Sequence, residues 1–211
     1  MASITASLPK PTERLCRWLM LAALWLLPPL AWAAEVEVVA PQVAYGEEDY
    51  VLSADFRFAL TPRLEEAVER GVVLYFVVDF EMTRGRWYWF DETVAARSQT
   101  YALSYHALTS QYRLSSGGLH QSFATLAEAL AVLSRLRNWP IADHQDSALR
   151  PGATYQAALR LRLDLNLLPR PFQISALGSR DWHLASEWKS WTLVLPSALP
   201  PPPPLPPEAR P

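Results

Sequence analysis

The sequence predicts one mainly β domain, an antiparallel β-sandwich that is immunoglobulin-like in architecture and carries one or two short helices. Apolar and polar residues alternate from Tyr155 to Leu165, which is the pattern of a half-buried strand. Turn signals at residues 46–49 and 117–118 separate segments of strand length. No long helices alternate with the strands, as they would in a parallel doubly wound sheet. We therefore expect seven to nine strands and two helices.

Residues 36–45 and 50–60 are the first two expected strands, joined by a polar turn at residues 46–49. In the second strand, the apolar residues of one parity predict a buried face: Leu52, Ala54, Phe56, Phe58 and Leu60. Pro41 cannot donate a hydrogen bond to a central ladder, so the first strand is predicted to be an edge or bulged strand.

A short helix is expected to begin at Thr61-Pro62, with threonine as the N-cap, and to close at Gly71. The unbroken apolar run from Val72 to Val78 predicts a strand covered on both faces. We expect a turn at residues 83–86, a strand at 87–90, and strand structure from Gln99 to Leu114 that is broken by Gly117-Gly118.

The second helix is expected from Thr125 to Asn138, because Thr125 and Glu128 have capping-box spacing and leucines recur at helical period. Trp139-Pro140 would end it. Residues 143–152 are predicted to be loop and 168–171 irregular. Short strands are expected at 172–177 and 189–195, after the strand that begins at Tyr155.

The two ends of the chain differ from its middle in composition. Basic residues, an apolar run from Trp18 to Trp32 and the sequence Ala31-Trp32-Ala33 predict a signal peptide over residues 1–33, cleaved after Ala33. The run is too short and too rich in proline for the alternative, an uncleaved membrane anchor. Residues 34–195 would form the single domain. Residues 196–211 are a proline-rich segment expected to be a disordered tail, with a docking ligand for an aromatic groove as the alternative.

These features predict a periplasmic protein that is not an integral membrane protein after cleavage. The only cysteine, Cys16, lies in the predicted leader, so no disulfide-linked partner is expected. Removal of the leader takes away three of the 19 basic and one of the 21 acidic residues, and the remaining chain has a net charge of −4. This acidic balance argues against nucleic acid as a partner and gives no electrostatic reason to adsorb on anionic lipid.

The sequence lacks the common nucleophile, phosphate-binding and zinc motifs, so we predict no catalytic residue, no cofactor and no metal site. The best metal-like cluster is Asp143-His144-Gln145-Asp146, for which a solvated polar loop is the favoured interpretation. The other histidines, His106, His120 and His183, are scattered, and none has a nucleophile that it would serve as a general base.

Two sets of residues are candidates for binding a partner. Arg160 and Arg162 share the wet face of their strand, and Arg57 of another strand is predicted to join them and receive an acidic partner. Trp182 and Trp188 belong to tryptophan clusters at strand ends, where exposed rings would suit a sugar or a protein. The alternatives are solubilising arginines and tryptophans packed in the core, and core packing is favoured for Trp87 and Trp89.

Several motifs in order resemble one known family. They are the series from Leu103 to Arg113, the helix start from Ala124 to Leu130, and the segment from Arg160 to Leu165 with Leu168-Pro169-Arg170-Pro171. Together they resemble the domain of unknown function 4390 (DUF4390) family of exported Gram-negative proteins, over about residues 35–195. The resemblance implies no activity. Members are often encoded beside a nitrogen-responsive sensor kinase, which implies an accessory role in the envelope.

The leading hypothesis is therefore a non-catalytic periplasmic module that binds another envelope protein, such as a sensor-kinase ectodomain. A carbohydrate- or peptidoglycan-binding module that uses the tryptophans is the alternative. An enzyme ranks third, because no constellation of catalytic residues stands out in the sequence.

Overall fold

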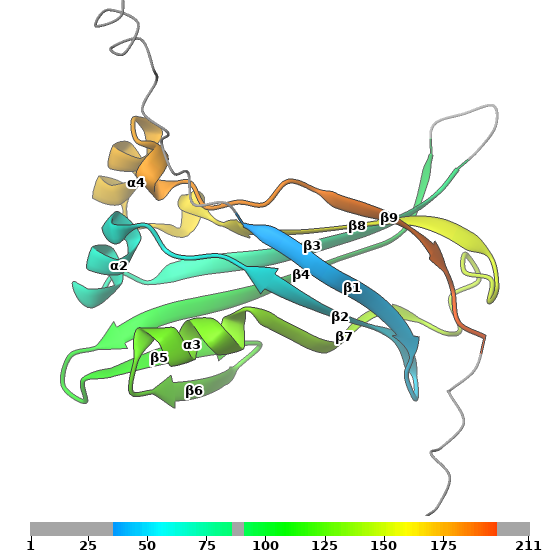
Figure 1. Cartoon of the computed structure of the whole chain (residues 1–211), viewed down its shortest axis with the longest axis horizontal. Coiled ribbons are helices and arrows are strands. Elements are labelled where there is room, and N and C mark those ends of the chain that lie inside the picture. Colours follow the sequence, from blue (N-terminus) through cyan, green and yellow to red (C-terminus); the bar gives the residue numbers. More distant parts are fainter. Residues whose placement is uncertain (1–35, 86–90, 198–211) are drawn as a thin grey trace, which may run out of the picture. The chain divides into compact units, whose positions relative to one another are not determined.

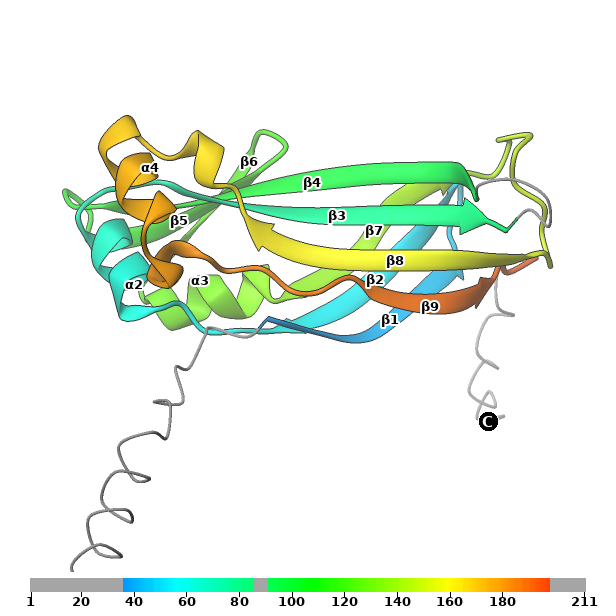
Figure 2. The ribbon, with the colours of Figure 1, turned by 90° about the horizontal axis from the view of Figure 1, so that it is seen from above.

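The domain consists of two antiparallel sheets, described here in a computed structural model over residues 36–85 and 91–197. The smaller sheet has the order β1 (Glu37–Tyr45), β2 (Asp49–Arg57), β7 (Arg135–Asp143). The larger has the order β6 (Leu119–Phe123), β5 (Gln111–Ser116), β4 (Glu92–His106), β3 (Leu74–Arg84), β8 (Thr154–Leu163), β9 (Lys189–Val194). The two sheets form separate layers (Figures 1 and 2). The mainly β, sandwich-like fold class is thus confirmed.

Three short helices accompany the sheets: α2 (Pro62–Glu69), α3 (Leu126–Leu133) and α4 (Arg170–Leu177), with 3₁₀ turns at η1 (Leu165–Leu167) and η2 (Arg180–Trp182). Helices α2 and α4 lie at the same end of the sheets (Figure 1). Over the described ranges, no helix is long and apolar enough to cross a membrane.

The core lies between the sheets, on the faces that alternation predicts. On β8 the inward residues are all buried: Tyr155, Ala157, Leu159, Leu161 and Leu163. On β2 the buried residues are Tyr50, Leu52, Ala54 and Phe56, so the predicted parity of both strands is correct. Because side chains alternate across a strand, the arginines of β8 must then lie on the outer face of the larger sheet.

The predicted edge position of the first strand is also confirmed. β1 pairs only with β2, and its register shifts between Val39 and Gln42. Ala40, at this bulge, has a φ of 47°, and Pro41 follows it. A proline lacks the ladder donor, so a bulge on an edge strand is where it is tolerated.

The local signals around α2 are confirmed in the structure. The Thr61 side chain accepts a hydrogen bond from the Leu64 amide at 3.3 Å, and Pro62 opens the helix. Gly71 has a φ of 85°, which lets the chain leave α2 in a left-handed conformation and enter β3. On β3, Val77 is buried on the outer face as well, as the unbroken apolar run indicates.

The predicted second helix is too long. α3 ends at Leu133, and the next residues form β7, which pairs with β2 from Arg135 onward. Leu136, which fits the helical period, is instead buried opposite Ala54 of β2. The free edge of β2 thus outweighs local helix propensity. Pro140 is accommodated because β7 is itself an edge strand.

Two further predictions of local structure are wrong, and one is incomplete. Thr83 and Arg84 do not turn but extend β3, opposite Thr93 and Glu92. The predicted strand structure from Gln99 to Leu114 is present in β4 and β5, but the chain folds back between them after His106, in a turn that contains no glycine or proline. The segment 172–177 is not a strand but lies in a third helix, α4, because prolines are compatible with a first helical turn.

The predicted signal peptide, the predicted strand at residues 87–90 and the tail beyond residue 197 lie outside the described residues. Immunoglobulin-like architecture stays a prediction. The described strands establish only two antiparallel sheets of three and six strands.

Candidate functional site

One buried acidic residue lies at the centre of the outer face of the larger sheet. Asp79 of β3 is only 8 % exposed, while its neighbours Val78 and Phe80 point into the core. The register of the sheet places Ser98 of β4 and Arg160 of β8 directly opposite it. The pairing of β3 with β4 and β8 therefore brings a carboxylate, a hydroxyl and a guanidinium group together on one face.

Two arginines share the carboxylate of Asp79. The Nε atoms of Arg160 and Arg162 lie 3.0 and 2.8 Å from its Oδ2 atom. The other oxygen, Oδ1, accepts a hydrogen bond of 2.7 Å from the Ser98 hydroxyl. The side chains of Arg160 and Arg162 are about one-third exposed, at 33 % and 31 %. Each arginine binds Asp79 through Nε, which leaves Nη donors available to other acceptors, and Nη1 of Arg162 lies 3.7 Å from Oδ2 of Asp164.

Burial alone would raise the pKa of Asp79, but the hydrogen bonds from Arg162, Ser98 and Arg160 outweigh it and hold the pKa below its ordinary value. Asp79 is therefore ionised at neutral pH. Two guanidinium groups share the Asp79 carboxylate, and a second carboxylate, that of Asp164, lies 3.7 Å from Nη1 of Arg162. The charges of these four residues balance.

A tryptophan ring supports the first of these arginines. The Arg160 guanidinium carbon lies 4.3 Å from the centre of the Trp188 ring, a cation–π contact that fixes the side chain against the sheet. The groove beside the cluster has a volume of about 230 Å³. Besides Asp79, Arg160 and Arg162, the residues that line it are Phe80, Glu81, Ala96, Arg97 and Ser98. We refer to this feature as the arginine groove.

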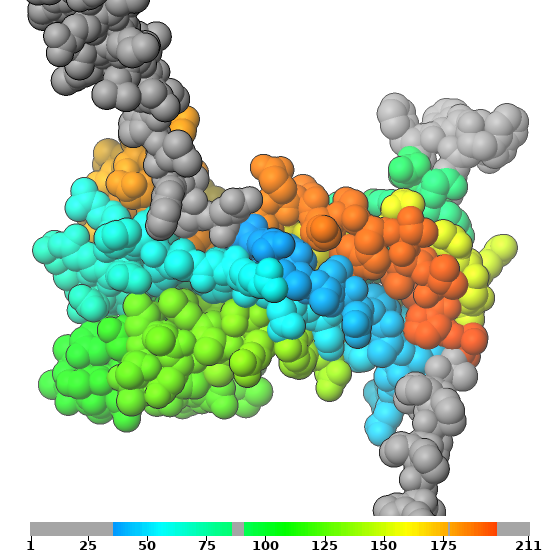
Figure 3. Space-filling model, in the orientation of Figure 1, coloured from blue at the N-terminus to red at the C-terminus, as the bar shows by residue number. Residues whose placement is uncertain are grey.

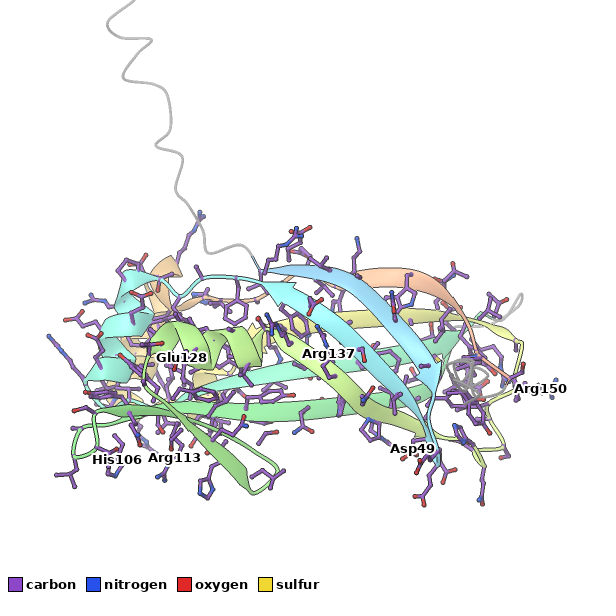
Figure 4. All side chains as sticks on the ribbon, turned by 60° about the horizontal axis from the view of Figure 1, so that its bottom comes forward. Asp49, His106, Arg113, Glu128, Arg137 and Arg150 are labelled. Carbon is purple, nitrogen blue, oxygen red and sulfur yellow. The ribbon has the colours of Figure 1, made fainter. Side chains whose placement is uncertain are left out.

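The predicted binding residues do not all meet here. Arg57 is on β2 of the smaller sheet, exposed and 3.3 Å from Glu37, so it does not join Arg160 and Arg162. It lines a separate groove with Arg135 and Arg137. Arg137, labelled in Figure 4, is bound by Asp55 at 2.5 Å. Figure 3 shows the face of the molecule over which β1 and β2 lie.

The two candidate tryptophans also differ from each other. Trp182 is 3 % exposed and packs against Phe172, with ring centres 5.5 Å apart. It is part of the core, and almost none of its surface is exposed to a partner. Trp188 is half-buried at the arginine groove, so of the two only Trp188 belongs to the same surface as Arg160 and Arg162.

Sequence reasoning missed Asp79, Ser98 and Arg97. The predicted strand ended at Val78, one residue before the buried acid. A carboxylate that continues an apolar strand, in a chain with paired arginines on another strand, is the signal that points to Asp79. The register that joins the strands cannot be read from the sequence, because strands far apart in the chain pair only in the fold.

The loop from Asp143 to Asp146 has no metal-binding arrangement. No group of three or more histidine, cysteine or acidic side chains able to hold a metal ion is found in residues 36–85 and 91–197. The His144 ring instead stacks on Tyr45, with centres 3.8 Å apart. His106 ends β4 at the far end of the sheets from Asp49 (Figure 4), and its Nδ1 lies 3.4 Å from the Thr109 hydroxyl.

Residues 33–192 match the family described as Domain of unknown function (DUF4390). The chain belongs to the DUF4390 family. The match covers most of the sequence and includes every described strand of both sheets, ending at Thr192 within β9. No curated protein matched this DUF4390 chain, and no solved structure did.

Proposed function

We propose that this DUF4390 protein is a non-catalytic accessory module of the periplasm that binds an acidic segment of another envelope protein through the arginine groove. The observation that carries the proposal is the pair of arginines held by one buried carboxylate. Asp79 orients both guanidinium groups, and Asp164 lies close to that of Arg162. The remaining donors suit carboxylate side chains, which guanidinium groups bind through two parallel hydrogen bonds.

The charge of the groove supports an acidic partner. Its lining has three arginines, at positions 97, 160 and 162, against two acids, Asp79 and Glu81. The chain as a whole has a net charge of −2, so the groove reverses the sign of the molecule locally. A positive patch attracts an acidic segment, whereas the surrounding acidic surface repels it.

A periplasmic location rests on the leader. The signal-peptide pattern over residues 1–33 supports export, and cleavage after Ala33 would release the domain. A sensor-kinase ectodomain is a partner of the right location. It is supported by the family resemblance alone.

Carbohydrate binding is the weaker alternative. A sugar platform needs exposed ring faces, whereas Trp182 is buried and the Trp188 ring is covered by Arg160. Protein binding needs hydrogen-bond donors, and the guanidinium groups of Arg160 and Arg162 on this surface provide them.

Charge reversal at Arg97 tests the proposal while sparing the Asp79 cluster, because Arg97 is exposed and, among the residues that the structure describes, donates only to the carbonyl of Ala96. In affinity capture from a crosslinked envelope fraction, Arg97→Glu should lose a protein that the unmodified chain retains. The matched control is Arg57→Glu, an exposed arginine on the other sheet, which should retain it. Retention by both variants would exclude the arginine groove as the binding surface.

A further inference from the structure

About half of β4, from residue 93 to residue 100, lies at an edge of the larger sheet as described and runs along the arginine groove. β4 pairs with β3 over its length from Glu92 to Leu103, whereas its pairing with β5 stops at Tyr101. Within the described part of the chain, residues 93–100 therefore have a strand neighbour on one side only. An unpaired edge of this length presents a row of backbone donors and acceptors that another strand can complete.

The direction of the free backbone groups follows from one contact. The Ala96 carbonyl accepts a hydrogen bond of 3.2 Å from Nη1 of Arg97, so it points to the free edge rather than to β3. Backbone groups alternate along a strand, so those of Ser98 and Thr100 point the same way. Ala96, Ser98 and Thr100 are exposed and small, and none of them blocks the approach of a second strand.

We propose that the β4 edge over residues 95–100 receives an extended acidic segment of the partner as an added strand. This inference rests on the proposed function and names how the partner binds. Strand addition supplies affinity through backbone hydrogen bonds, and alternate side chains supply specificity. On the groove side the added strand neighbours Ser98 of β4, while Asp79 and Arg160 lie one and two strands further into the sheet. A glutamate of the added strand would therefore reach over Ser98 towards the arginines.

Two other occupants fit this edge less well. The chain's own tail is rich in proline from Pro196 onward and lacks the amide donors that a ladder needs. A second copy paired edge to edge would bring two Arg97 side chains and two positive grooves together. An acidic segment instead lets the Arg97 guanidinium leave the Ala96 carbonyl and bind a carboxylate.

Position 96 offers a matched pair of variants for the test. Ala96→Pro removes an amide donor that faces the free edge, and the ladder to β3 does not use that donor. Ala96→Thr keeps the donor, and threonine is a good strand former.

The probe is a blocked, fluorescein-labelled peptide of about ten alternating glutamate and threonine residues, a full strand in length. The same peptide with lysine in place of glutamate is the charge control. Fluorescence anisotropy measures binding of each peptide to the chain without its predicted signal peptide, residues 34–211.

We expect saturable binding of the acidic peptide, none of the lysine peptide, and an affinity about tenfold lower for Ala96→Pro, with Ala96→Thr unchanged. Circular dichroism checks that both variants keep the β fold. Equal affinity of Ala96→Pro and the unmodified protein, or no binding of the acidic peptide, would overturn strand addition. Loss of partner capture by Arg97→Glu would still support the proposed function in that case. A concentration-dependent dimer that Ala96→Pro abolishes would assign the edge to a second copy instead.

Discussion

At the scale of single residues, Asp79 determines how the outer face of the larger sheet is built. It is buried, hydrogen-bonded on both oxygens, and bound to two arginines from the neighbouring strand. A buried carboxylate is stable only when its charge is paired and its oxygens accept hydrogen bonds. Arg160 and Arg162 are thus not simply solubilising residues.

Asp79→Asn should lower the free energy of unfolding at neutral pH by about 2 kcal/mol, the value of charged hydrogen bonds at a partly exposed site. Because the folded pKa of Asp79 is lowered, its stabilising effect is complete well above the ordinary value of 3.8 and fades as the pH falls below it. Urea unfolding of both proteins across this range measures the difference. A difference that persists unchanged at low pH would show that ionisation of Asp79 is not its source.

Leu161→Asp should prevent folding, because Leu161 is fully buried and an unpaired carboxylate in the core costs as much as the stability of a domain. Alternation alone predicts that Arg162→Glu is harmless. The structure predicts that it destabilises the domain, since it would place a second carboxylate beside Asp79. Arg162→Gln, which adds no charge, should be the milder variant in thermal unfolding. Equal stability of the glutamate and glutamine variants would contradict this.

At the scale of elements, the sequence predicts structure well where the pattern is local and poorly where a distant strand decides. β8, β2 and α2 carry their own alternation, cap or turn residues, and each was predicted with its correct face or start. β7 exists because β2 offers an edge, and that cause lies far away in the chain. β6, in contrast, follows from a local turn signal, because Gly117 and Gly118, with φ of 55° and 87°, turn the chain back along β5.

The cap of α3 is a local prediction that can be measured. The Thr125 hydroxyl accepts a hydrogen bond of 3.2 Å from the Glu128 amide. Thr125→Ala should lower the free energy of unfolding by about 1 kcal/mol. Thr125→Ser retains the capping hydroxyl, so its free energy of unfolding should stay close to that of the unmodified protein. Chemical denaturation of the two variants decides the point. If serine costs as much as alanine, the hydroxyl does not cap the helix.

At the scale of the whole molecule, the two sheets decide which arginines act together. Outward arginines on different strands look equivalent in the sequence, but Arg57 is on the smaller sheet and Arg160 and Arg162 are on the larger one. The candidate site was therefore predicted in part. Its arginine pair follows from alternation, whereas Asp79, Arg97 and the contact with Trp188 follow only from strand order and register.

The proline-rich tail should contribute little to stability, since its residues lack the donors needed for a sheet or helix. A chain that ends at Ser197 should melt within about two degrees of the full chain, because unpacked termini carry little stability. Differential scanning calorimetry of the two chains measures this. A large fall in Tm would mean that the tail packs on the domain.

Site-specific photo-crosslinking in living cells tests the central claim most directly. A photoreactive amino acid replaces Arg97 at the arginine groove or, as the control, Arg57 on the smaller sheet. The account predicts a discrete adduct with an envelope protein from position 97 and none from position 57. Adducts from position 57 alone, or from neither position, would contradict the assignment of the arginine groove as the binding surface.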